Sequence, residues 1–203
     1  GTAVAVKKSG GAVAVANIKE ALQKQAAENA GRIAPSGGKS IRVGQDKSFT
    51  LPDGTKTRDD LQLVVVDFVS RNDWYDRPFS KDEMTAPACF AIHANPKELV
   101  ASDNSPIKQN DDCASCPMNA FGSSPTGAGK ACSNTRLLAV LPPDADEDTD
   151  IWLLKVSPTA IKEFDGFVAG VNRTFQMPPV GVVVTVGFNE TKDFPSLTFK
   201  DAQ

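Results

Sequence analysis

The positions of the cysteines constrain this chain more than any other feature. The 203 residues include only four cysteines, and three of them, Cys113, Cys116 and Cys132, lie in one segment, with Cys89 upstream. Two thiolates separated by two residues hold one ion from a single tight turn, and two more from other loops complete a tetrahedron. The same spacing is poor for an unstrained disulfide. The pattern therefore favours a metal site at these four cysteines over disulfides or buried free thiols.

Zinc is the metal that this pattern favours. With four thiolate ligands no position stays open for water, so the ion would be structural rather than catalytic. Four thiolates would equally hold an iron–sulfur cluster, and spacing does not separate the two. His93, the only histidine, follows Cys89 by four residues on the same side of a predicted strand. A site of three cysteines and His93 is a less favoured alternative.

Composition bounds the class of protein. The length suits one sizeable domain with an appended arm, and 40% hydrophobic with 23% charged residues is ordinary for a globular protein. A net charge of −3 gives no general basic field for nucleic acid, so any such contact needs a local groove. No apolar run approaches the ~20 residues that span a bilayer, and no signal-peptide pattern begins the chain. We expect a cytosolic protein without a membrane partner, in a compartment that keeps thiols reduced.

Hydrophobic periodicity divides the chain into two parts. Residues 1–38 predict a small Val/Ala-rich arm followed by a helix over 17–30, and residues 39–203 predict a β domain. In the second part Ser157 and Pro158 begin the clearest helix, whose apolar face holds Ile161, Phe164, Val168 and Val171. Strands are predicted over the following ranges: 40–43, 48–51, 61–69, 89–93, 137–141, 151–156, 181–188 and 196–200.

From Leu61 onward the strong elements run strand, strand, strand, helix, strand, strand. This is the order of an oligonucleotide-binding (OB) barrel, a five-stranded sheet with a helix between its third and fourth strands. A β-sandwich with one helix would give nearly the same pattern. The predicted sheet is interrupted by a metal-binding insertion at about 95–133, too long for a structureless connection unless an ion organises it.

The sequence gives little support for an enzymatic function. The loop from Gly122 to Lys130 resembles a phosphate-binding P-loop, but Ser124 stands where that motif needs glycine, and Ala131 where it needs serine or threonine. The glycines more plausibly let the backbone wrap closely around a metal. A single histidine without an evident partner and carboxylates scattered over polar loops pair no nucleophile with a base, so the chain is predicted not to be an enzyme.

Aromatic and basic residues suggest a nucleic-acid contact. Two large rings and two guanidinium groups follow the longest predicted strand, and a further ring and two cations flank the cysteine segment. Rings that stack on bases and cations that meet phosphates are what a single-strand groove requires. The alternative is that the rings cover the core and the arginines solvate it. The candidates are Arg71, Trp74, Tyr75, Arg77, Phe121, Lys130 and Arg136.

The segment from Cys113 to Ser123, with Gly127 to Cys132 and Arg136 to Val140, resembles a group of small proteins encoded by tailed bacteriophages and prophages. The resemblance extends upstream to Cys89 and downstream to Phe199, and so covers most of the chain after Leu61. It implies an accessory of phage DNA replication or recombination that binds single-stranded DNA, and four cysteines that act together. The acidic composition and the absence of a dense Lys/Arg run depart from the pattern of a DNA binder.

These observations support three hypotheses. The first is a phage single-stranded-DNA-binding protein without base preference, with a structural zinc, acting in the host cytoplasm alongside phage replication proteins; Trp74→Ala or Tyr75→Ala would weaken its binding. The second is a structural or assembly protein of the phage particle with a structural metal. The third is an iron–sulfur redox protein.

Overall fold

Strands make up most of the regular secondary structure. A computed structural model describes residues 39–77 and 85–201, which belong to one compact unit, Lys39–Gln203. The arm and helix predicted for residues 1–38 lie outside the described residues. The strands are β1 (Ser40–Val43), β2 (Phe49–Thr50), β3 (Lys56–Thr57), β4 (Leu61–Trp74), β5 (Cys89–His93), β6 (Ser133–Leu141), β7 (Trp152–Val156), β8 (Val183–Phe188) and β9 (Leu197–Asp201). The α-helix of this part is α2 (Ile161–Phe175), and short 3-10 helices span Pro96–Glu98, Pro117–Asn119, Pro158–Ala160 and Pro179–Gly181.

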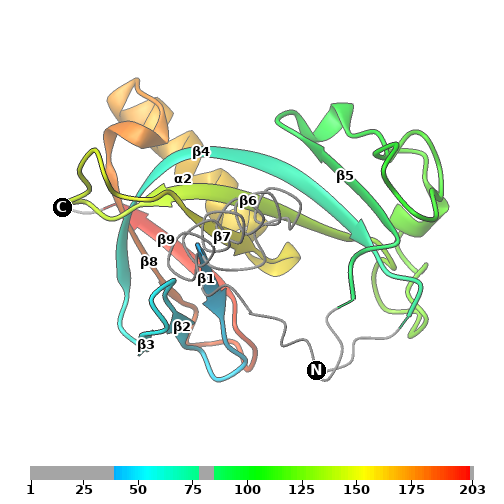
Figure 1. Cartoon of the computed structure of the whole chain (residues 1–203), viewed down its shortest axis with the longest axis horizontal. Coiled ribbons are helices and arrows are strands. Elements are labelled where there is room, and N and C mark those ends of the chain that lie inside the picture. Colours follow the sequence, from blue (N-terminus) through cyan, green and yellow to red (C-terminus); the bar gives the residue numbers. More distant parts are fainter. Residues whose placement is uncertain (1–38, 78–84, 202–203) are drawn as a thin grey trace, which may run out of the picture. The chain divides into compact units, whose positions relative to one another are not determined.

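These strands form one curled, mixed sheet in the order β3-β2-β1-β7-β6-β4-β8-β9, with β5 paired to β4 (Figure 1). Neighbours are antiparallel except β1 and β7, which are parallel. The prediction of a mainly β fold with a helix between the third and fourth main strands is confirmed. The hydrogen-bonded path has two ends, because β7 pairs with β1 rather than closing a five-stranded barrel. The sheet is therefore a half-barrel.

Strand β4 organises this sheet. It pairs with β6 along most of its 14 residues. On its other edge β8 pairs with Leu61–Val64 and β5 with Ser70–Trp74. Figure 1 shows β8 and β9 at one end of β4 and β5 at the other. One strand thus connects the main core with the region that carries the cysteines.

A β-bulge in β4 decides which side chains face inward. The register with β6 shifts between Val65 and Asp67, leaving Val66 as the extra residue. Before the bulge Leu63 and Val65 are buried in the core, whereas after it Phe68 packs against that core. Because successive strand residues point to opposite faces, one inserted residue exchanges the two sets. Even-numbered residues after the bulge therefore lie on the inner face, and odd-numbered residues on the outer face.

Helix α2 covers the inner face of the sheet. The ring of Phe164 is completely buried and makes edge contacts with Phe68 of β4, at 5.0 Å between centroids, and with Phe199 of β9, at 5.2 Å. The helix begins as predicted after Ser157, through the 3-10 turn Pro158–Ala160. Phe167 is buried where the predicted face placed Val168, which is only partly buried. No helix of the described residues is long and apolar enough to cross a membrane.

The prediction for the end of the longest strand was wrong. It placed the strand end at Val69 with Arg71 and Trp74 in the following loop, but β4 continues to Trp74. Asn72 and Asp73 are disfavoured in strands by propensity. Pairing with both β5 and β6 nevertheless holds them in the sheet, because backbone hydrogen bonds on two edges outweigh that preference.

The insertion at residues 95–133 has little regular structure. It contains the 3-10 turns Pro96–Glu98 and Pro117–Asn119 and one isolated bridge between Val100 and Asp112. Leu99 and Cys113 of the insertion form a small buried apolar cluster with Ala91 of β5, and this cluster shares no residue with the main core. Such a cluster buries too little apolar surface to order some forty residues of chain.

Removal of the Phe164 ring tests the packing of α2. Phe164→Ala should lower the free energy of unfolding by about 3–5 kcal/mol, because the cavity lies between β4, β9 and the helix. Phe175→Ala is the matched control, since that ring is 46% exposed on the same helix and its loss should change stability by ~0.5 kcal/mol or less. Urea unfolding followed by circular dichroism measures both, and equal effects would contradict this packing.

Candidate functional site

The four cysteines line one small cavity. Cys89 is the first residue of β5, Cys132 immediately precedes β6, and Cys113 and Cys116 come from the insertion. All four are free thiols, and Cys113 and Cys132 are buried. The remaining lining residues are Asn72, Trp74, Phe90, Ala91, Gln109, Asn110, Met118 and Asn119. The structure thus brings together the four residues that sequence spacing had grouped.

Local hydrogen bonds shape the turn that carries Cys113 and Cys116. The Asp112 carboxylate accepts the backbone N–H groups of Ala114, at 3.1 Å, and Ser115, at 3.0 Å. The Asn119 amide donates to the Cys113 carbonyl at 2.7 Å, and the Asn119 N–H donates to the Cys116 carbonyl at 2.9 Å. These bonds hold both thiols on one short turn.

The environment of the thiols opposes their ionisation. Burial first, and then the neighbouring cysteines and Asp73, raise the pKa of Cys132 to about 12. Burial also raises the pKa of Cys113, with a smaller opposing effect from a hydrogen bond with Asn72. Negative charge on one thiol therefore disfavours it on the others. A cation bound among them would reverse this balance.

The four thiols line the same cavity, but they are not arranged as the ligands of a metal ion. Across residues 39–77 and 85–201, no group of three or more His, Cys, Asp or Glu side chains stands in an arrangement that could hold a metal ion. His93 is not among the residues that line the cavity. Its Nδ1 contacts the Asn95 carbonyl oxygen at 3.1 Å, and its Nε2 lies 3.8 Å from Glu98.

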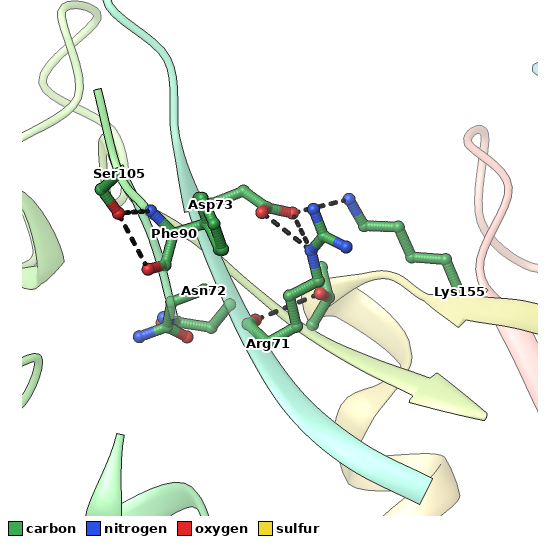
Figure 2. A network of polar contacts seen from close by, with 8 residues as sticks. Arg71, Asn72, Asp73, Phe90, Ser105 and Lys155 are labelled. Carbon is green, nitrogen blue, oxygen red and sulfur yellow. Dashed lines mark hydrogen bonds and ion pairs between the residues drawn. The ribbon is translucent and has the colours of Figure 1, made fainter. Parts of the chain in front are cut away.

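An ion-pair network lies on the outer face of the sheet (Figure 2). Arg71 Nε donates to both oxygens of Asp73, at 2.8 and 2.9 Å, and Lys155 Nζ lies 3.2 Å from Asp73 Oδ2. The Asp73 side chain is completely buried, whereas those of Arg71 and Lys155 are 28% and 49% exposed. Two cations share one carboxylate, so the network presents net positive charge to solvent.

Aromatic and apolar side chains surround this network. Tyr75 is 40% exposed, and its pKa is raised first by burial and then by the charge of Asp73, with Arg71 opposing. Ile92 pairs with Arg71 across β4 and β5, and Leu153 lies two residues before Lys155 on β7; both are exposed. We call Arg71, Tyr75, Ile92, Leu153 and Lys155 the outer patch. Its composition resembles a stacking platform with cations.

Of the seven predicted nucleic-acid residues, Arg71 and Tyr75 belong to the outer patch and the other five do not. Trp74 lines the cysteine cavity, and the inner-face alternation of β4 separates it from Tyr75. Arg136 donates to the Asp165 carboxylate of α2 from Nη2 at 3.0 Å and Nε at 3.3 Å, with its side chain 13% exposed. Arg77 is exposed beside Asp76. Arg136 therefore ties the helix to the sheet, and Trp74 supports the cavity.

Phe121 and Lys130 form a second aromatic and basic pair. Phe121 is 85% exposed, and Lys130 Nζ lies 5.1 Å from its ring centroid. Lys130 also donates to Asn119, at 3.1 Å, and to Asn134, at 2.9 Å. The loop between them is closed by a 2.7 Å bond from the Gly122 N–H to the Gly129 carbonyl, both glycines having positive φ. This fixes an exposed ring on a constrained loop.

Sequence reasoning missed Asn72, Asp73 and Lys155. The alternation of inward and outward side chains along a strand could have predicted which face of the sheet each of them occupies. That prediction needed the strand from Leu61 to be extended to Trp74 and its bulge to be recognised. Lys155 lies between the buried residues Leu154 and Val156, a pattern that places its side chain on the opposite face.

Comparison with protein-family models, with curated proteins and with solved structures found no match to this chain. The site is therefore interpreted from its own geometry.

The Arg71–Asp73 pair can be tested by a double replacement. Arg71→Met should lower the free energy of unfolding by roughly 2–3 kcal/mol, because the buried Asp73 carboxylate keeps only Lys155. Adding Asp73→Leu removes the buried carboxylate that has lost its Arg71 partner, and should recover at least half of the lost stability. Urea unfolding measures the stability of both variants. A double variant no more stable than Arg71→Met would contradict the role of Arg71 as the partner of the buried Asp73 carboxylate.

Proposed function

We propose that this protein binds single-stranded DNA across the outer patch, without base preference. The observation that supports the proposal is the network in which Arg71 and Lys155 share the buried Asp73 beside the exposed ring of Tyr75. Cations can meet phosphates while the ring and the aliphatic side chains contact bases, and every base has a face on which to stack. An acidic chain needs such local concentration of positive charge.

The strand order supports an OB-like architecture for this interface. The order β7-β6-β4-β8-β9, with α2 between β7 and β8, corresponds to a five-stranded OB sheet opened between its third and fifth strands. OB domains bind oligonucleotides on their second and third strands and on the loops after the first and fourth. The corresponding strands are β6 and β7, and β7 carries Leu153 and Lys155 of the outer patch. The cysteine insertion lies in the loop region after the first strand.

The proposal includes further contacts outside the outer patch. Phe121 with Lys130, and the exposed Arg77, supply an additional ring and two cations on segments connected to β4 and β6. Arg136 and Trp74 would not contact DNA in this proposal. Arg136 holds α2 against the sheet through Asp165, and Trp74 lines the cysteine cavity. The resemblance of the cysteine segment to phage proteins supports a role in phage DNA replication or recombination, in the host cytoplasm and alongside phage replication proteins.

In this proposal Cys89, Cys113, Cys116 and Cys132, which line one cavity, bind a single structural zinc. The ion would fix the insertion to the ends of β5 and β6. Four thiolates leave no open position, so the ion would support folding and not chemistry.

Loss of the Tyr75 ring tests the DNA interface. Tyr75→Ala should weaken binding of a fluorescent oligothymidylate by about 5- to 150-fold, the equivalent of ~1–3 kcal/mol of stacking. Lys155→Ala should flatten the plot of log affinity against log salt by about 0.7 for one lost phosphate contact. Phe175→Ala serves as the control and should bind normally. Fluorescence anisotropy at low salt gives these values, and absence of binding by the unaltered protein would reject the function.

Metal analysis of the purified protein tests the proposed zinc. We expect one zinc per chain and no visible absorption band, because zinc bound by four thiolates is colourless. Cys132→Ser should lose most of this metal, since it removes a ligand that no other cysteine replaces. Elemental mass spectrometry and thiol titration provide the measurement. Iron with visible absorbance, or two disulfides without metal, would refute the zinc assignment.

A further inference from the structure

The outer patch and the cysteine cavity use alternate residues of the same short stretch of β4. After the bulge at Val66, Asn72 and Trp74 face the cavity. Arg71 and Asp73 belong to the outer face, where Figure 2 shows the ion-pair network. The exposed Tyr75 directly follows β4 and is close enough to feel the charges of both. Any displacement of this stretch therefore moves both sites together, and a slip of one residue would exchange their side chains.

Both strands that flank this stretch begin at a cysteine of the cavity. Cys89 opens β5 and pairs with Trp74. Cys132 immediately precedes β6, whose first residue, Ser133, pairs with Asp73. An ion that joins Cys89 to Cys132 would hold β5 and β6 on the two edges of β4. The backbone geometry of Asp73 and Tyr75 would then depend on that clamp.

Apart from the pairing of β4 with β5 and β6, this end of the sheet has little apolar packing. Its buried apolar cluster consists of Ala91, Leu99 and Cys113, separate from the main core. Polar bonds supplement it: Asn134 Nδ2 donates to Asn72 Oδ1 at 2.7 Å and to Asn119 Oδ1 at 3.0 Å. Regions with few apolar contacts open locally at low free-energy cost. The ion would supply the order that packing lacks.

We infer that metal bound at the four cysteines controls the affinity of the outer patch for single-stranded DNA. This inference rests on the proposed function and adds its regulation. With metal, Arg71, Asp73 and Tyr75 are preorganised for the strand; without metal, binding must also order the ends of β4, β5 and β6. The coupling is reciprocal, so DNA must raise the affinity for metal by the same factor.

The test compares zinc-loaded and chelator-stripped full-length protein. Stripping should weaken oligothymidylate binding at least tenfold, and added zinc should restore it. A chromogenic chelator should extract zinc from the DNA-bound protein with an equilibrium constant lowered by that same factor. Circular dichroism should show that the stripped protein keeps a cooperative unfolding transition, because the main core contains none of the cysteines.

Control variants separate this inference from the proposed function. Tyr75→Ala should weaken DNA binding while leaving zinc affinity in the absence of DNA unchanged. Cys116→Ser, which alters the insertion and not β4, should reproduce the effect of stripping. Equal DNA affinity of loaded and stripped protein would overturn the coupling while leaving the function intact. Global unfolding on stripping would also overturn it, whereas a loaded protein that fails to bind would remove the proposed function itself.

Discussion

The β-bulge at Val66 is the constraint on which the rest of this structure depends. It shifts the register of β4 against β6 by one residue, and so exchanges the inner and outer sets of side chains halfway along the strand. Without that shift, the residues that now face the cysteines would face solvent, and the buried core contact of Phe68 would be lost. The first half of β4 builds a core with α2, and the second half presents two different surfaces.

Those two surfaces have opposite requirements. The inner one gathers thiols whose burial and mutual proximity raise the pKa of Cys132 to about 12, so that its thiolate forms only when a cation compensates the charge. The outer one keeps the Asp73 carboxylate completely buried beneath two cations, Arg71 and Lys155. The carboxylate fixes the positions of both cations, and the network retains net positive charge. In a chain with net charge −3, such a local excess is what could attract a phosphate backbone.

Sequence reasoning recovered the strand order, the helix after Ser157 and the grouping of the four cysteines, because each carries a local signal: alternation, a cap or a spacing. It missed the continuation of β4 to Trp74, since Asn72 and Asp73 disfavour strands and only pairing on both edges keeps them there. It also grouped Trp74 with Tyr75, although neighbouring strand residues face opposite ways. The tie between Arg136 and Asp165 spans two elements, and no local pattern indicates such a contact. The sequence also did not predict that the barrel stays open. The parallel pairing of β1 with β7 joins segments that are far apart in the chain, and no local pattern indicates such a pairing.

The central claim is that β4 carries a metal centre on one face and a nucleic-acid interface on the other. A crystal structure of the protein with a short oligothymidylate, recorded at the zinc absorption edge, examines both faces at once. The account predicts a single anomalous peak surrounded by the sulfur atoms of Cys89, Cys113, Cys116 and Cys132, with a base stacked on Tyr75 across the sheet. Sulfur atoms paired as disulfides, or an oligonucleotide bound away from the outer patch, would contradict it.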